Sequence, residues 1–243
     1  MRMLFCATIS ERRIMKKALR YFSPFEWILI LVSYTAILST FFIFDRENVL
    51  NLISTLIGIA ALVFSAKGNP FGPLLMIIFS ICYGIISFPL AYYGEMITYL
   101  GMSLPMSVWA FIAWFRNPYG KGHATVKVSG IRGKEWLLLA GLTLVVTVAF
   151  YFILDALHTD KLIPSTLSVS TSFAASYLTA RRSPYFALAY AANDVVLIVL
   201  WVLATIGDMG NLSVTVCFSV FLINDLYSFF NWCRMAKTQK KAT

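Results

Sequence analysis

The sequence lacks most features of a soluble enzyme. Charged residues make up only 13% of its 243 residues and hydrophobic residues 59%, so little chain remains for a soluble domain. Its four cysteines form no CxxC pair, which argues against a disulfide framework or a cysteine-based metal site. It also contains no GxxxxGK[ST], GxSxG or HExxH motif. We therefore predict neither an enzyme nor a bound metal or cofactor.

The chain instead contains eight hydrophobic segments, each long enough to cross a bilayer as a helix. A bilayer core about 30 Å thick needs roughly 20 helical residues, and the apolar runs are continuous, which excludes membrane-spanning strands. The first run is too long for the hydrophobic region of a signal peptide and lacks a small-residue cleavage site, so we expect it to remain in the mature chain. The sequence predicts an all-α integral membrane protein with helices at 25–44, 48–66, 70–94, 96–115, 136–154, 162–180, 184–206 and 211–233.

Positive charge lies on one side of these segments. If the first segment leaves the cytoplasm, all of the 20 Lys and Arg residues except Arg46 and Lys161 fall on the cytoplasmic side, as the positive-inside rule describes. Both termini are therefore expected in the cytoplasm. The basic residues that give the net charge of +9 flank the helix ends, where anionic lipid headgroups attract them. We therefore predict no nucleic-acid partner. The two histidines, His123 and His158, would lie on opposite sides of the membrane and could not cooperate.

The second half of the chain resembles the first at an offset that drifts from 109 to 118 residues. Each half contains four predicted helices, an even number, so the two units would run parallel. Parallel repeats hold the substrate between them in one of the two common transporter designs. A duplicated scaffold without transport, or a membrane enzyme, remains an alternative. Six pairs occur in the same order: Glu26-Trp27 with Glu135-Trp136, Asp45 with Asp155, Ser54-Thr55-Leu56 with Ser165-Thr166-Leu167, Lys67 and Pro70 with Arg181 and Pro184, Gly94-Glu95-Met96 with Gly207-Asp208-Met209, and Trp114-Phe115-Arg116 with Trp232-Cys233-Arg234.

Two acidic residues fall deep inside the hydrophobic segments, where an ionisable side chain is costly and marks a functional site. Asp194 and Asp225 each follow an asparagine, Asn193 and Asn224. At 1.5 Å per helical residue, both acids lie about 13 to 15 Å from the cytoplasmic end of their helices. We expect them to share a depth near the midplane, where either ligand contact or structural pairing would account for them.

A polar stripe follows one side of the last predicted helix. Asn224, Tyr227, Ser228 and Asn231 recur at spacings of three and four residues, which places them on one helix face. Lipid cannot satisfy this stripe, so it faces protein or an aqueous cavity. Amides, a phenol and nearby acids suit a neutral or cationic polar ligand. Hydrogen bonding between helices is the alternative.

Several aromatic residues lie deeper than the headgroup level. A flat ring at this depth can stack on a planar or cationic ligand, although ordinary core packing explains any single one of them. Pro105, with Gly101 one turn before it, permits a kink that could act as a hinge. The deeper aromatic residues are Tyr83, Tyr99, Trp109, Tyr190 and Trp201.

Over about residues 48–234 the chain resembles the PnuC family of nicotinamide riboside transporters. The most specific match is the ending Asn224-Asp225-Leu226-Tyr227-Ser228-Phe229-Phe230-Asn231-Trp232. The chain departs from the family pattern at Phe229 and Phe230, where more tryptophan is expected, and in its serine-rich sixth segment. Weaker matches are Leu52-Ile53-Ser54, Gly58, Ala66-Lys67-Gly68, Tyr83, Tyr93-Gly94-Glu95, Trp109, Trp114, and Asp194 seven residues before Trp201.

The resemblance implies a three-plus-one-plus-three arrangement of helices related to the SWEET transporters. Residues 48–115 and 162–233 would form two parallel three-helix bundles joined by a linker helix at 136–154. Residues 25–44 would be an extra N-terminal helix, and residues 1–24 and 234–243 cytoplasmic basic tails. The resemblance also implies facilitated diffusion of nicotinamide riboside across a bacterial inner membrane, and a homotrimer.

Carried over residue by residue, the resemblance also implies a substrate site. We expect the pyridinium ring to stack on Trp109 or Tyr227, Asn224 to bond the amide or ribose, and the bundles to rock around Pro105. A transporter of a related vitamin or nucleoside, such as thiamine, riboflavin or a deoxynucleoside, is the alternative. A membrane enzyme or assembly protein is less favoured. The full set of expected contacts is Asn224, Tyr227, Asn231, Asp194, Asn193, Trp109, Tyr83 and Trp201.

Overall fold

The protein is all-helical in the part of the chain that the structure describes. The structure is a computed structural model, which describes residues 21–44, 46, 49–87, 96–120, 124–159, 161–207 and 212–241. The predicted all-α class is confirmed for these residues. The helices are α2 (Pro24–Phe44), α3 (Val49–Ala66), α4 (Phe71–Ser87), the π-helical turn η1 (Thr98–Ser103) continuing into α6 (Leu104–Phe115), α7 (Gly133–Ala156), α8 (Leu162–Ala180), α9 (Tyr185–Gly207) and α10 (Leu212–Lys241).

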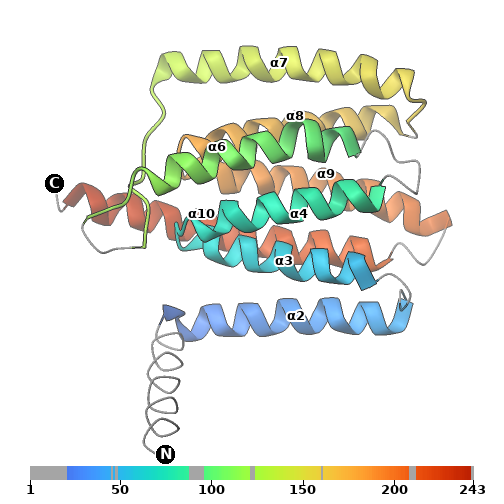
Figure 1. Ribbon diagram of the computed structural model, residues 1–243, viewed down its shortest axis with the longest axis horizontal. Coiled ribbons are helices and arrows are strands. Elements are labelled where there is room, and N and C mark those ends of the chain that lie inside the picture. Colours follow the sequence, from blue (N-terminus) through green and yellow to red (C-terminus); the bar gives the residue numbers. More distant parts are fainter. Residues whose placement is uncertain are drawn as a thin grey trace, which may run out of the picture.

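Six of these helical stretches are long and apolar enough to cross a membrane: α2, α3, η1 with α6, α7, α9 and α10. The described part of α4 is shorter, at 17 residues, and α8 is less apolar because serine and threonine recur along it. Both lie alongside the other helices (Figure 1). The predicted end of the third segment, residues 88–94, lies outside the described residues.

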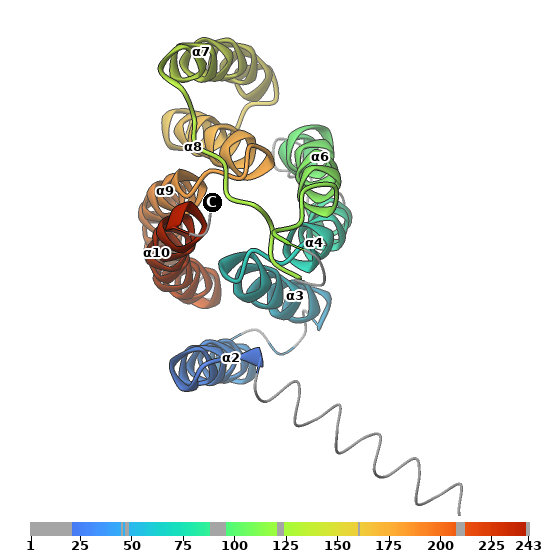
Figure 2. The ribbon, with the colours of Figure 1, turned by 90° about the vertical axis from the view of Figure 1, so that its left-hand side faces the viewer.

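The helices run side by side along the long axis of the molecule (Figure 1). Viewed along this axis, α3, α4, α6, α8, α9 and α10 surround the centre, and α2 and α7 lie outside this ring (Figure 2). The helix α2 packs on α3 and α10, whereas α7 packs on α8. The two outer helices therefore occupy the periphery at opposite sides of the ring.

The last helix is longer than predicted. It continues to Lys241, where hydropathy led us to expect a tail from residue 234. Residues 234–241 are mostly Arg, Met, Ala, Lys and Gln, which favour helix even where they are too polar for lipid. The side chain of Gln239 is also buried, and its amide bonds to Val126 O at 3.1 Å and Val128 N at 2.8 Å. The residues of the predicted N-terminal tail up to residue 20 lie outside the described residues.

The turns after α3 and α8 have the same backbone structure. Gly68 and Arg182 both have positive φ, at 66° and 59°, and both turns contain the two reverse hydrogen bonds of a Schellman motif. The loop between α6 and α7 bonds to both turns, because Val126 N donates to Gly68 O and Ser129 N donates to Arg182 O. This loop therefore connects equivalent points of the two halves. We call the end of the bundle that contains these turns, the loop and residues 232–241 the basic end.

Ion pairs also repeat between the two halves. Glu26 in the first turn of α2 pairs with Lys67 after α3, with 2.9 Å between Oε2 and Nζ. Glu135 in the first turn of α7 pairs with Arg181 after α8, with 3.1 Å between Oε2 and Nη2. These four residues belong to the pairs from which the sequence predicted an internal duplication. The structure thus contains matching contacts at equivalent positions of both halves.

The predicted irregularity at Pro105 takes the form of a π-helical turn before it. Leu104 N–H bonds to Tyr99 O, five residues back, which widens the helix by one residue. Pro105 follows at the start of α6 and has no N–H to donate to an earlier carbonyl. The turn carries Tyr99 and Ser103 to the wall of the central cavity.

Candidate functional site

A cavity of about 90 Å³ lies in the centre of the ring, between the two halves. The first half contributes Ser65, Tyr99, Ser103 and Ser107, and the second Ser172, Ser176, Thr179, Tyr190, Asn193, Asp194 and Asp225, with apolar side chains from both. Two lining residues are acidic and none is Lys or Arg. The cavity therefore suits a ligand with hydroxyl or amide groups and a neutral or positive charge.

Asp194 of α9 and Asp225 of α10 are brought together at the wall of this cavity. Their exposed fractions are only 3% and 2%, and their carboxyl groups interact with each other. Asp194 Oδ2 and Asp225 Oδ1 have no hydrogen-bond partner. Two adjacent carboxylates repel each other in a low-dielectric site, so a cation bound beside them would relieve this repulsion and favour their ionised form.

Asn193 is held at the cavity wall by the serine-rich helix α8. Its Oδ1 accepts hydrogen bonds from Thr171 Oγ1 at 2.8 Å and Ser168 Oγ at 3.1 Å. One turn further along, Ser176 Oγ and Tyr190 OH lie 3.0 Å apart. The hydroxyl groups of α8 thus orient the polar side chains of α9. Sequence reasoning did not include Ser176 in the site, although its position among the small polar residues of this segment was a usable signal.

The polar stripe on α10 faces α2 and the end of α3. Asn224 Nδ2 donates to Ser33 Oγ at 3.1 Å and to Val220 O at 2.8 Å. Tyr227 OH donates to Glu26 Oε1 at 2.7 Å, and Asn231 Nδ2 donates to Ala66 O at 2.7 Å. In this conformation the stripe makes bonds between helices, which was the alternative. Asn224, Tyr227 and Asn231 are not among the cavity-lining residues, and their contact with substrate stays a prediction.

The remaining predicted aromatic contacts are dispersed. Trp109 is 42% exposed, and its ring packs edge-on against Tyr177, with 5.7 Å between centroids. Trp201 packs on the cluster of α2, α3 and α10. Tyr83 lines a second pocket. The structure brings Tyr99 and Tyr190 to the central cavity instead.

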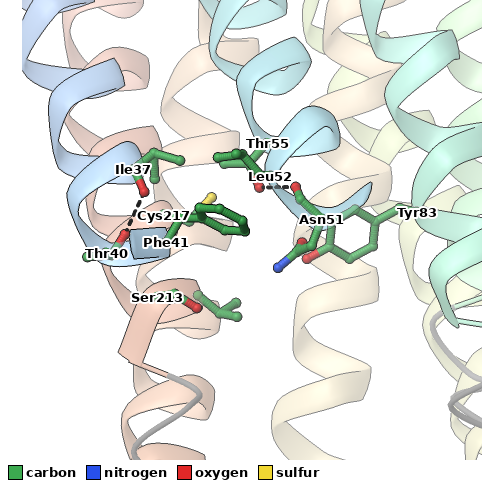
Figure 3. Close-up of a pocket in the computed structure, with 10 residues that line it drawn as sticks. Ile37, Thr40, Phe41, Asn51, Leu52, Thr55, Tyr83, Ser213 and Cys217 are labelled. Carbon is green, nitrogen blue, oxygen red and sulfur yellow. Dashed lines mark hydrogen bonds between the residues drawn. The ribbon is translucent and has the colours of Figure 1, made fainter. Parts of the chain in front are cut away.

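The second pocket, shown in Figure 3, lies between α2, α3, α4 and α10, away from the basic end. Its volume is about 20 Å³, which is room for a single water molecule. The hydroxyl groups of Thr40 and Thr55 turn back onto the carbonyl groups of Ile37 and Asn51 (Figure 3). This pocket is therefore a weaker candidate than the central cavity.

Comparison with known proteins identifies related membrane transporters. The family model described as nicotinamide mononucleotide transporter matches residues 48–234. The nicotinamide riboside transporter PnuC of Neisseria mucosa is 24% identical over 217 residues, covering 87% of this chain and 81% of that protein. The protein of the same name from Haemophilus influenzae is 25% identical over 192 residues, covering 79% and 82%.

A solved structure has the same fold. The crystal structure of the vitamin B3 transporter PnuC superimposes with a TM-score of 0.75 and 23% sequence identity, covering 90% of this chain and 94% of that one. The predicted fold class, a helical membrane protein of this kind, is therefore confirmed. The family match does not include α2, although Glu26 and Ser33 of α2 bond to residues within it.

Proposed function

The chain belongs to the nicotinamide mononucleotide transporter family, and from this premise we propose that it transports nicotinamide riboside through the central cavity. Both curated relatives carry that substrate in their names. The chain is a multi-pass protein of the bacterial inner membrane, and we propose that both termini and the basic end face the cytoplasm. Facilitated diffusion by alternating access, without enzymatic activity, is the mechanism we propose.

The observation that carries this proposal is the pair of buried acids in a cavity lined by no basic residue. Nicotinamide riboside has a planar, positively charged ring, a carboxamide and sugar hydroxyl groups. Asp194 and Asp225 would balance the charge of the ring, and Tyr99 or Tyr190 would stack on it. Asn193 and the serine hydroxyl groups would bond the carboxamide and the ribose.

The same charges argue against the mononucleotide in the family's description. A phosphate group is a dianion at neutral pH, and helix N-termini, Lys or Arg usually bind it. In this cavity it would face two acids and no basic side chain. We therefore propose that the cavity accepts nicotinamide riboside, whose 5′-hydroxyl group is uncharged, and does not accept its 5′-phosphate ester.

The cavity must widen to load this substrate. A volume of about 90 Å³ holds only a few water molecules, whereas sites for small organic ligands have about 300 to 1,000 Å³. Loading therefore requires the two halves to separate. The π-helical turn beside Pro105 is where we propose that α6 bends, because its backbone bonding is already irregular there.

Asp194 and Asn193 are the predicted site residues that we propose as direct contacts in the present arrangement of the helices. Contacts at Asn224, Tyr227, Asn231, Trp109, Tyr83 and Trp201 remain proposals for a more open state. The division into bundles 48–115 and 162–233, joined by the helix at 136–154, is likewise proposed. So is a homotrimer, which rests on the resemblance alone.

Exchange of labelled nicotinamide riboside in proteoliposomes tests this function. We expect unlabelled nicotinamide riboside to compete and its 5′-phosphate not to compete. Asp194→Asn, which keeps the shape and removes the charge, should reduce exchange about ten-fold or more, because hydrogen bonds to a charged group contribute about 1.5 to 3 kcal/mol. Asp155→Asn is the matched control, since Asp155 lies exposed at the far end of α7.

Three results would contradict the proposal. Exchange of thiamine or a deoxynucleoside in place of nicotinamide riboside would assign the chain to a related vitamin or nucleoside. Equal competition by the 5′-phosphate would refute the charge argument. If no solute crossed at all, a membrane enzyme or assembly protein would become the better hypothesis.

A further inference from the structure

Two tryptophans meet at the basic end of the central cavity. Trp114 at the end of α6 and Trp232 in α10 are both fully buried, and their ring centroids are 5.1 Å apart. Phe186 packs edge-on against both rings, at 4.9 Å from Trp232 and 6.2 Å from Trp114. Val126, from the loop that crosses this end, is fully buried in the same cluster. The seam between the halves is therefore filled at this end.

The two indole groups bond crosswise between the halves. Trp114 Nε1 donates to Thr179 O at 2.7 Å, which joins the last helix of the first half to α8. Trp232 Nε1 donates to Ser65 O at 2.8 Å, which joins the last helix of the second half to α3. The duplication pairs Trp114 with Trp232, so these are equivalent bonds made in opposite directions. Each half therefore donates one indole hydrogen bond to the other half.

These bonds lie next to the cavity. Ser65 and Thr179, whose carbonyl oxygens accept them, both line it, as do Phe186 and Ala110, one helical turn before Trp114. Separating the halves at the basic end would break both N–H bonds and the contact between the rings together. Because both bonds span the same seam, the closed arrangement should open in one step.

We propose that Trp114 and Trp232 form the gate that closes the basic end of the cavity. This inference rests on the proposed transport function only in that the cavity is taken as the substrate path. A solute that enters from the opposite end stays enclosed until both indole bonds break. If the two tryptophans served only to pack the core, their N–H groups would not control access to the cavity.

Thiol labelling tests the gate. Ala110 is 2% exposed and lines the cavity, so Ala110→Cys in a background without the native cysteines reports whether the basic end is open. A membrane-impermeant maleimide is added to sealed vesicles on the side of the basic end, without substrate. Trp114→Phe and Trp232→Phe keep a ring and remove the N–H donor. Each should raise the labelling rate about five-fold, as expected for the loss of one hydrogen bond.

Trp136→Phe is the matched control, because Trp136 is 41% exposed on the outer helix α7. A rise confined to the two gate variants and to maleimide added at the basic end supports the gate. An unchanged rate, or an equal rise from both sides or in the control, overturns it. If a gate variant does not fold, Phe186→Leu, which loosens the packing against both rings, is judged by the same criteria. The labelling experiment needs no substrate. If labelling gave the expected result while nicotinamide riboside was not transported, the proposed substrate would be refuted and the proposed gate would still be supported.

Discussion

Replacing Glu26 with alanine should destabilise the protein more than the same change at its repeat equivalent, Glu135. The Glu26 side chain is only 4% exposed. It accepts hydrogen bonds from Ser23 N at 2.6 Å, Lys67 Nζ at 2.9 Å and Tyr227 OH at 2.7 Å. It thereby connects α2 to the end of α3 and to α10.

The Glu135 carboxylate has similar chemistry in a more open setting. It accepts from Arg181 and from Tyr177 OH, the latter at 3.3 Å, but it is 16% exposed and Arg181 is 39% exposed. Water and lipid headgroups can therefore replace part of what Arg181 loses. The two sites differ mainly in burial, which makes them a matched pair.

The expected difference follows from what each change leaves behind. Removing one partner of a buried ion pair costs about 3 to 5 kcal/mol, and we reduce this to about 2 to 3 kcal/mol because Lys67 is 22% exposed. Lys67 Nζ also keeps its position near the Tyr21 ring, 5.0 Å from the centroid. Glu135→Ala should cost about 1 kcal/mol or less.

Thermal unfolding in a single detergent at a fixed scan rate measures the difference, since membrane proteins often unfold irreversibly. At about 2 to 4 °C per kcal/mol for a chain of this size, the midpoint should fall by roughly 4 to 12 °C for Glu26→Ala and by no more than about 4 °C for Glu135→Ala. Glu26→Gln, which keeps an acceptor for Tyr227, should lie between them. Equal shifts, or a larger one at Glu135, would refute the reasoning from burial.

Two further changes test the packing and the basic end. A Cβ added at Gly72 would lie 2.7 Å from the backbone nitrogen of Ser65, whereas a Cβ added at Gly141 would have no neighbouring atom within 4 Å. Gly72→Ala should therefore force α3 and α4 apart and lower the unfolding midpoint by several degrees. Gly141→Ala is the control and should leave the midpoint unchanged or slightly higher. Gln239→Leu keeps the volume and loses both bonds to the loop; proteolytic cleavage between residues 117 and 132 should then become faster, and unchanged cleavage would show that Gln239 does not hold the loop.

Much of the site's chemistry was readable from the sequence, but its geometry was not. The rise per helical residue predicted that Asp194 and Asp225 would meet at one depth, and both line the same cavity. The spacing of the α10 stripe predicted one polar face, but a spacing does not identify the neighbour that this face meets. That neighbour is α2 for Asn224, which bonds to Ser33. Ser176 and Tyr190 line the cavity with their hydroxyl groups 3.0 Å apart because α8 and α9 pack together.

The sequence by itself determined the helical membrane class, because only long apolar helices satisfy their backbone in lipid. It also determined the repeated residues that became ion pairs and crosswise indole bonds. Tertiary structure decided which face of each helix meets the cavity. Asn224 and Asp225 are adjacent in the chain but about 100° apart around the helix axis, so one bonds to α2 and the other lines the cavity. Only the positions of α2, α9 and α3 around α10 set that division.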